Sequence, residues 1–293
     1  MSLFPLFLIL LSTILHAGWN VLARRSGGKV VAQYFSRILI MTVVLGAVPA
    51  IWIQTSSPLI PAGAWLLLIA SGICCGVYYA ALSKAYAHEE LNVVYPIARA
   101  IPVIFVGVFD IFLNQAPSLL GWGGMIIVVL GCIFVALRSG ESVSVSTVFG
   151  PSTVPLLGAA LGTTGYSVLD NAAAELVVIG PTSAAVYCYF YLAAGAFVYF
   201  SITNQKAFWK INLKIDFMPV LAGVILNFGA YWLVLWAYQM SSRAGYVVAC
   251  RQFSIVVGVI MAIVFLKERV PMHRWFAVGS IMVGLFIILV WGR

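Results

Sequence analysis

The sequence predicts an all-α integral membrane protein with ten transmembrane helices, arranged as two inverted repeats of five. Three observations predict this fold class. Hydrophobic residues form 63% of the 293 positions and charged residues 8%, which is too little charge for the surface of a water-soluble domain. Apolar stretches long enough to cross the hydrocarbon layer of a bilayer follow one another along the chain. The second half also repeats residues of the first at a nearly constant spacing.

The apolar stretches are bounded by charged residues or by clusters of glycine, proline and serine. The first lacks the basic start and small-residue cleavage site of a signal peptide, so we expect it to be retained as a span. The second carries Arg37 in its first turns, from where a long side chain can snorkel to the membrane surface. The connections are short, which predicts one compact bundle. In order, the expected spans are 3–22, 31–53, 64–84, 91–113, 118–137, 154–175, 181–202, 217–240, 244–266 and 274–292.

Basic residues fall on alternate connections between these spans. Connections after the odd-numbered spans hold eleven lysines and arginines, against Arg243 and Arg293 on the other side. Because basic loops stay in the cytoplasm, both termini are predicted to lie outside it. The expected membrane is the inner (plasma) membrane of the cell. The eleven residues are Arg24, Arg25, Lys29, Lys84, Arg138, Lys206, Lys210, Lys214, Lys267, Arg269 and Arg274.

Internal identities divide the chain into residues 1–146 and 147–293, five spans each. "HAGWNVL" (16–22) also resembles "TTGYSVL" (163–169). Five is an odd number, so the second repeat crosses the membrane in the opposite sense. The identities are Tyr79 with Tyr231, Ala85 with Ala237, Tyr86 with Tyr238, Arg99 with Arg251 and Ile111 with Ile263 at a shift of 152, and Trp122 with Trp275 and Gly131 with Gly284 at a shift of 153.

Several function classes are disfavoured by what the chain contains. The net charge of +8 lies mostly in short loops and serves topology, so no nucleic-acid partner is expected. The five cysteines lie in apolar segments without C-x-x-C spacing, and we predict no disulfide, metal site or cofactor. Three scattered histidines and no G-x-S-x-G motif argue against an enzyme. No phosphate-binding loop for ATP is present in the sequence.

Three ionisable residues within predicted spans are the first candidates for a binding site. Arg99 lies between Pro96 and Pro102 in span 4, where the prolines are expected to loosen the helix, and Arg251 is its repeat partner in span 9. A guanidinium suits a carboxylate, phosphate or phosphonate of a substrate. The alternative is that each arginine pairs with a buried carboxylate, with Asp170 a partner for Arg251.

The two intramembrane aspartates are expected to differ in role. Asp170, in "GYSVLDNAAAE", is the best candidate for a carboxylate that exchanges a coupling proton or binds a substrate amine. A permanent ion pair with an arginine is the alternative. Asp110 lies close to the end of span 4, and we expect it to be solvated at the mouth of the bundle.

Polar aromatic residues and one asparagine complete the predicted site. Their flat faces and hydrogen-bonding tips suit a cavity wall, and aromatic walls also suit organic cations. Packing between helices is the competing role for each of them. The small-residue runs "GAALGTTG" (158–165) and "GWGG" (121–124) are expected to let helices approach closely. The candidate wall residues are Trp19, Asn20, Tyr79, Tyr95, Tyr166 and Tyr231.

The chain has ten predicted spans as five plus five, "YPIARAIPVIFV" in span 4, "LKE" closing span 9, and a tryptophan followed nine residues later by glycine in spans 5 and 10. In these features it resembles the EamA-type members of the drug/metabolite transporter superfamily. The likeness covers nearly the whole chain. It implies a central cavity between the two repeats and alternating access without ATP. One departure is "LNQ" (113–115), where an acidic residue is common; Glu268 keeps that residue in the second half.

Residues and resemblance together predict a secondary active transporter of a small anionic or zwitterionic metabolite, such as an amino acid or an organophosphonate. The partners expected are this small molecule, with or without a coupling proton, and the lipid bilayer, for a monomer or a homodimer. One alternative is an exporter of cationic or hydrophobic compounds, with Asp170 as the cation or proton site and the arginines structural. Another is a flippase for lipid-linked head groups, which needs a cavity open sideways to lipid.

Overall fold

The computed structural model describes residues 2–25, 31–88, 91–136, 153–203, 217–241, 243–267 and 270–292. Each expected span is a helix whose ends fall within four residues of the predicted ones, except that the ninth consists of two helices, α10 and α11, placed end to end. The helices of the described residues are α1 (Leu3–Arg25), α2 (Val31–Ser56), α3 (Ala62–His88), α4 (Leu91–Phe112), α5 (Leu119–Ala136), α7 (Thr153–Ala174), α8 (Pro181–Thr203), α9 (Phe217–Tyr238), α10 (Ala244–Cys250), α11 (Phe253–Leu266) and α12 (Met272–Trp291).

The composition of these helices fits a multi-pass membrane protein. Seven stretches within the described residues are long and apolar enough to cross a membrane, among them Ala244–Phe265, which runs through α10 and α11; Leu119–Val135 is apolar but shorter. Large apolar side chains stand exposed on the outside of the bundle, for example Val48 (77% exposed) and Leu119 (88%). Such a surface would be costly in water and is the surface a lipid environment requires.

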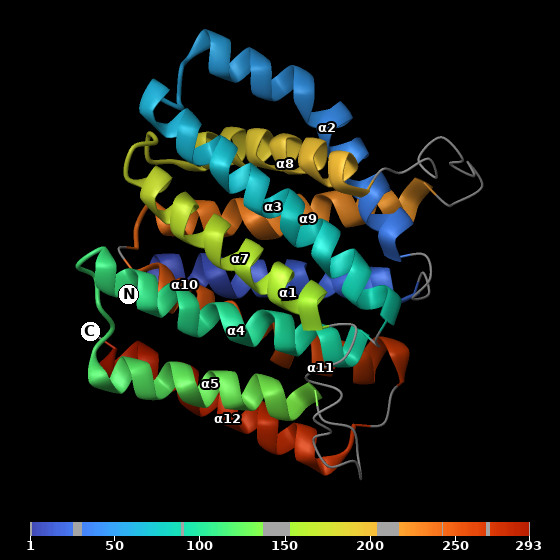
Figure 1. Cartoon of the computed structure of the whole chain (residues 1–293), viewed down its shortest axis with the longest axis vertical. Coiled ribbons are helices and arrows are strands. Elements are labelled where there is room, and N and C mark those ends of the chain that lie inside the picture. The colour runs from blue at the N-terminus through green and yellow to red at the C-terminus, as the bar shows by residue number, and fades with distance from the viewer. Residues whose placement is uncertain are drawn as a thin grey trace.

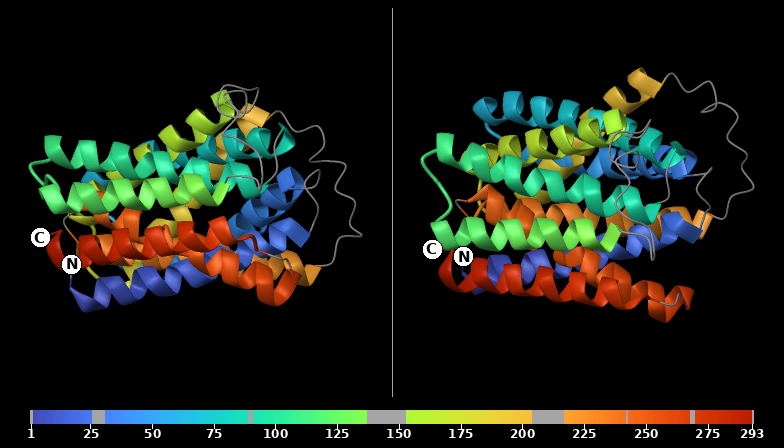
Figure 2. Two further views of the ribbon diagram at one scale, coloured as in Figure 1. Left: turned by 90° about the horizontal axis from the view of Figure 1, so that it is seen from below. Right: turned by 60° about the horizontal axis from the view of Figure 1, so that its bottom comes forward.

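The helices run side by side, and their termini gather at two opposite ends of the bundle (Figures 1 and 2). Both termini lie at one end, here named the terminal end, together with the connections 57–61, 113–118, 175–180 and 239–243. The helix ends at Arg25, His88 and Ala136 lie at the other end, here named the basic end because Arg24, Arg25, Lys84 and Arg138 lie at or near these positions in the sequence. The connections after the odd-numbered predicted spans therefore begin at one end of the bundle, and those after the even-numbered spans lie at the other, together with the termini.

Helix pairs from the two halves of the chain pack closely: α5 with α12, α3 with α7 and α1 with α9. Glycines make two of these approaches possible. A Cβ on Gly162 of α7 would lie 2.8 Å from the carbonyl oxygen of Cys74 in α3. A Cβ on Gly124 of α5 would lie 2.7 Å from the carbonyl oxygen of Gly284 in α12. The predicted role of the two small-residue runs is thus confirmed.

Candidate functional site

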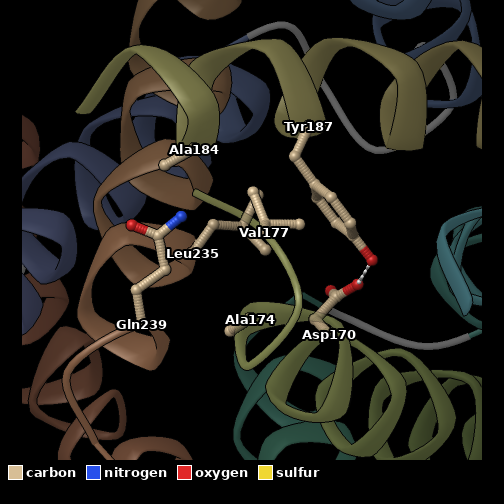
Figure 3. A pocket seen from close by; sticks show the side chains of 7 residues that line it. All are labelled: Asp170, Ala174, Val177, Ala184, Tyr187, Leu235 and Gln239. Atoms are coloured by element: carbon tan, nitrogen blue, oxygen red, sulfur yellow. Dashed lines mark hydrogen bonds between the residues drawn. The ribbon is translucent and has the colours of Figure 1, made fainter. Parts of the chain in front are cut away.

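Asp170 is the acidic centre of a buried group of hydroxyls, which we name the carboxylate cluster: Asp170, Ser71, Tyr187 and Tyr231. Ser71 of α3 donates a hydrogen bond to Oδ1. Tyr187 of α8 donates to the same oxygen over 2.9 Å (Figure 3). Tyr231 of α9 donates to Oδ2. Asp170 itself is 1% exposed. Three donors from three helices satisfy a group that as a carboxylate only accepts, and this compensates the cost of burying it.

Arg251 stands next to this cluster without touching its carboxylate. Its guanidinium carbon lies 5.3 Å from the ring centre of Tyr231, within the range of a cation–π contact. Tyr166 and Tyr238 also lie within reach of its charge. Among the described residues, the direct partners of Asp170 are the three hydroxyls and not Arg251. The permanent ion pair considered from the sequence is therefore not formed in this structure.

Arg99 is the centre of a second buried group, which we name the arginine cluster: Arg99, His16, Trp19 and Gln252. Its Nε donates to Oε1 of Gln252 over 3.1 Å, and its Nη2 donates to the backbone carbonyl oxygen of Arg251 over 3.2 Å. Its Nη1 lies 3.3 Å from Nε2 of His16, and Nδ1 of that ring lies 3.1 Å from Nε1 of Trp19. The two predicted arginines thus meet, but through the backbone of one of them.

The ninth span is interrupted at this meeting point, between α10 and α11. The backbone N–H of Gln252 donates to the carbonyl of Ala249, three residues earlier, and not to that of Val248, four residues earlier as in a regular α-helix. The side-chain Nε2 of Gln252 donates to the carbonyl of Val248 instead. Arg99 supplies a further donor to the carbonyl of Arg251. Irregular backbone inside a membrane bundle is tolerated only where protein or water satisfies it. Two side chains do so here, one from each half of the chain.

The prolines of span 4 do not interrupt their helix. Helix α4 runs as one helix from Leu91 to Phe112 with Pro96 and Pro102 inside it. The interruption lies between α10 and α11, whose sequence around Arg251 contains no proline. The interrupted span is the one that Arg99 contacts.

A continuous row of aromatic contacts joins the two clusters. Trp19 packs against Phe35, and Phe35 against Tyr79, at ring distances of 5.7 and 5.6 Å. Tyr79 contacts Tyr78, which contacts Tyr166 at 5.8 Å. Each of these contacts is edge-to-face, a favourable geometry for aromatic rings. Tyr166 then reaches Tyr231 at 5.5 Å, and Tyr231 stacks on Tyr191 at 4.8 Å.

A pocket reaches Asp170 from the terminal end of the bundle (Figure 3). Its empty volume is about 190 Å³, which includes open solvent at its mouth. Tyr187 and Gln239 are its other polar residues, and Gln239 holds the connection before α8 by accepting from the N–H of Gly180. The lining residues come from the ends of α7, α8 and α9: Asp170, Ala174, Val177, Ala184, Tyr187, Leu235 and Gln239.

Two further predicted wall residues, Tyr79 and Asn20, are buried and have different partners. Tyr79 donates to Oδ1 of Asn227 over 3.1 Å, and Asn20 donates to the carbonyl of His16 one turn earlier in its own helix. Asn20 therefore bonds through its Nδ2 to the backbone of its own helix. The side chain of Tyr95 lies outside the described residues.

Asp110 contradicts its predicted solvation. It is 0% exposed, and its Oδ2 accepts from the N–H of Gly245 at the start of α10 over 2.7 Å. A Cβ on Gly245 would lie 3.1 Å from the Cα of Gly107, so the backbones of α4 and α10 touch here. The position of Asp110 near the end of its own helix suggested exposure, but a neighbouring helix begins directly over it.

Sequence reasoning missed four residues that contact the predicted ones: Ser71, Tyr187, His16 and Gln252. Gln252 adjoins Arg251, and His16 opens the "HAGWNVL" repeat, so proximity to a predicted residue was a usable signal for both. Ser71 and Tyr187 carried no such signal, because one serine or tyrosine in an apolar helix is common. Within the described part of the chain, no group of three histidines, cysteines or acidic residues could hold a metal ion.

Comparisons with known proteins agree with this architecture. Residues 3–137 match the model of the EamA-like transporter family. A WAT1-related protein of Arabidopsis thaliana is 31% identical over 91 residues, which is 31% of this chain. The matched part spans 25% of the length of that relative. One crystal structure superposes on 98% of this chain and 96% of its own with a TM-score of 0.69 and 16% identity, which is a likeness of fold.

Proposed function

We propose that this chain, residues 3–137 of which match the model of the EamA-like transporter family, is a secondary active transporter of a small zwitterionic or anionic metabolite. The match supports the broad class, membrane transport of small molecules. The finer proposal concerns what is carried and how, and it includes an inner-membrane location with both termini outside the cytoplasm, as the basic connections favour.

The observation that carries the proposal is the separation of Asp170 from Arg251 by Tyr231. A buried acid and a buried base that paired with each other would neutralise both charges. Here the carboxylate is held by hydroxyls and the guanidinium by aromatic faces. A zwitterion such as an amino acid presents an ammonium for the first group and a carboxylate for the second, so both ends of the ligand find an opposite charge. Intramembrane charges held in this way are functional sites by default.

We infer further that residues 1–146 and 147–293 are the two inverted repeats. In this relation α1 corresponds to α7, α2 to α8, α3 to α9 and α5 to α12. The two-fold rotation that exchanges the repeats then turns the contact of α3 with α7 into the contact of α9 with α1. The contacts of α2 with α8 and of α5 with α12 each map onto themselves. The observed contacts include all four, which supports a two-fold axis in the plane of the membrane. Alternating access follows as the motion of one repeat against the other around the two clusters.

A second candidate is an exporter of organic cations, as the pocket also permits. The pocket reaches Asp170, and Arg251 is not among its lining residues. A cation entering from the terminal end would meet the carboxylate and the ring of Tyr187 first. In this case Arg251 contacts the neighbouring tyrosines and does not bind the substrate.

The experiment is a thermal-shift screen of the detergent-purified protein against amino acids, phosphonates, sugar phosphates and quaternary amines. A ligand that binds only the native protein raises its melting temperature by mass action. Hits are repeated with Asp170→Asn and Arg251→Ala. The matched control is Arg243→Ala, because Arg243 also lies over a tyrosine ring, 5.5 Å from that of Tyr246, but outside both clusters.

The expected result is a shift by a zwitterion or an anion that Arg251→Ala removes and Arg243→Ala keeps. For a zwitterion, Asp170→Asn removes it as well. Stabilisation by quaternary amines alone, lost in Asp170→Asn and kept in Arg251→Ala, would favour the cation exporter instead. Uptake of the hit into proteoliposomes, with and without an imposed proton gradient, then separates transport from binding and tests the coupling proton.

A further inference from the structure

The pocket that reaches Asp170 is narrow and mostly apolar. Its empty volume of about 190 Å³ includes open solvent, whereas pockets for small organic ligands usually hold about 300–1,000 Å³. Beyond the mouth there is room for about one water molecule. A water molecule therefore fits this pocket, and an amino acid or a phosphonate does not. The apolar walls are Ala174, Val177, Ala184 and Leu235.

Polar groups lie at opposite sides of the pocket, with Gln239 on one side and Asp170 and Tyr187 on the other (Figure 3). Gln239 is half-buried and belongs to a connection at the terminal end, whereas Asp170 is 1% exposed. The hydroxyl of Tyr187 lies 2.9 Å from Oδ1 of Asp170. A buried water needs about two to four polar partners, and the carboxyl and this hydroxyl supply them. The pocket can therefore lead water from the terminal end to a buried acid.

The hydrogen bonds of Asp170 leave one position open for a proton. A carboxylate has two acceptor oxygens with about two lone pairs on each. Oδ1 accepts from Ser71 and from Tyr187, whereas Oδ2 accepts from Tyr231. One lone pair of Oδ2 thus has no donor in the carboxylate cluster. A proton can add there without breaking any of the three hydrogen bonds.

Asp170 can change its charge because it is not held in a direct ion pair, which would favour the ionised form. The charged group that acts on it is Arg251, across the ring of Tyr231. The other titratable side chains near it are thiols and phenols, which are ordinarily neutral at neutral pH. These are Cys74 and Cys75 of α3, Tyr187, Cys188 and Tyr191 of α8, and Tyr231 and Tyr238 of α9.

We propose that the pocket is a water path through which Asp170 exchanges the coupling proton with the terminal end, and that the substrate does not enter by it. A hydronium ion in the pocket gives its proton to Oδ2, which leaves a water molecule and a neutral carboxylic acid, and release is the reverse step. Buried carboxyl groups serve as proton relays in this way in other membrane transporters. The proposal rests on the proposed function in taking the chain to be a secondary transporter.

A metal cation fits the pocket less well than a proton. Hard cations need several oxygen ligands. Besides the carboxyl of Asp170, the side chains that line the pocket offer the hydroxyl of Tyr187 and the amide oxygen of Gln239. That amide oxygen already accepts from the N–H of Gly180 over 2.9 Å. The remaining lining side chains are apolar, so a metal ion would lose most of its water without replacement.

The first experiment follows the carboxylic acid band of Asp170 by infrared spectroscopy of the detergent-purified protein. Asp170→Asn removes this band, so the difference from the native protein identifies it. A stopped-flow drop in pH then gives the rate at which Asp170 gains its proton. Ala184→Leu fills the pocket from α8 and, by excluding water, should slow this gain about tenfold or more. Ala185→Leu adds the same volume outside the lining and should leave the rate unchanged.

An unchanged rate in Ala184→Leu would overturn the proposal, because the proton would then reach Asp170 by another route. The proposal also falls if Asp170 shows no such band over the pH range in which the protein stays folded. If Ala184→Leu does not fold, Ala184→Val replaces it, with Ala185→Val as the control.

The size limit is tested with tetramethylammonium chloride, against sodium chloride at equal ionic strength. Both salts should change the melting temperature alike. A larger, saturable rise with the organic cation that Ala184→Leu removes would show that substrate-sized cations enter, and would overturn the water path.

The proposed function can fail separately. A ligand from the screen whose shift Arg251→Ala removes and Ala184→Leu keeps supports both proposals. A shift that Ala184→Leu removes as well, while Ala185→Leu keeps it, overturns the water path and leaves the transport of that ligand standing. A shift that Arg251→Ala keeps counts against the proposed substrate site alone, since the rate of protonation of Asp170 is measured without any ligand.

Discussion

Asp170 and Arg251 lie on two sides of Tyr231, and that tyrosine contacts both. Its hydroxyl donates to the carboxylate, and its ring faces the guanidinium at 5.3 Å. A hydroxyl that donates to an anion becomes richer in electron density, and so does its ring, which strengthens attraction to a cation. One side chain thus holds opposite charges near each other while leaving each of them available to a ligand.

Replacing Tyr231 should separate its two contacts. Tyr231→Phe keeps the ring below Arg251 and removes one of three donors to Asp170, so we expect a loss of about 1 kcal/mol in unfolding free energy. Tyr231→Leu removes both contacts and should cost several times more. Melting temperatures in detergent provide the measurement, with Tyr187→Phe, which loses one donor to the same carboxylate, as the matched control. Equal losses for the two Tyr231 variants would show that the ring contributes nothing.

Gln252 should hold the interruption of the ninth span. Gln252→Ala frees the carbonyl of Val248 and removes an acceptor from Arg99, and leaving buried groups unpaired costs roughly 1–3 kcal/mol each. Gln252→Glu keeps the acceptor for Arg99 and loses only the donor, so its cost should be smaller. Hydrogen exchange of the amides between Val248 and Ser254 measures the effect locally. Unchanged exchange in Gln252→Ala would show that the interruption is stable without this side chain.

Much of the fold could be predicted from the sequence because each membrane helix satisfies its own backbone and leaves a plain apolar signature. The positions of the spans followed from that signature alone. The interruption at Arg251 and Gln252 could not be predicted, since neither residue disfavours a helix. Arg99, which contacts the carbonyl of Arg251 at this interruption, is 152 positions away in the sequence.

The candidate site was predicted in its centres and missed in its partners. An aspartate or arginine in an apolar helix is conspicuous because burying it without compensation is costly. The hydroxyls and amides that compensate it are ordinary residues of other helices, and only packing brings them together. Asp110 shows the same limit, since its burial is caused by the start of α10 and not by its own surroundings in α4.

Gly245 should be required where α4 and α10 touch. A Cβ there would lie 2.8 Å from Oδ2 of Asp110 and 3.1 Å from the Cα of Gly107, so Gly245→Ala must push the two helices apart. Overpacking of this kind costs typically about 1–3 kcal/mol. Gly258→Ala is the matched control, because nothing lies within 4 Å of a Cβ at that helical position, and there alanine should be neutral or favourable. A native melting temperature for Gly245→Ala would contradict the close approach.

Access to Asp170 should be selective for positive charge. Val177 lines the pocket that leads to this carboxylate, and Val177→Cys places a thiol there at little change in volume. A unit negative charge about 4 Å away contributes about 1 kcal/mol even at the dielectric constant of water, so the carboxylate of Asp170 should make a cationic thiol reagent react roughly fivefold faster than a neutral one of equal size. Asp170→Asn should abolish this preference, and the native chain, whose five cysteines are mostly buried, gives the background rate. If the terminal end faces outwards as the basic connections predict, a membrane-impermeant reagent added to intact cells should label Val177→Cys. Labelling only in inverted membrane vesicles would show that the terminal end faces the cytoplasm. Equal rates for both reagents would show that Asp170 does not act on what enters the pocket, which would remove the main support for binding an ammonium group there.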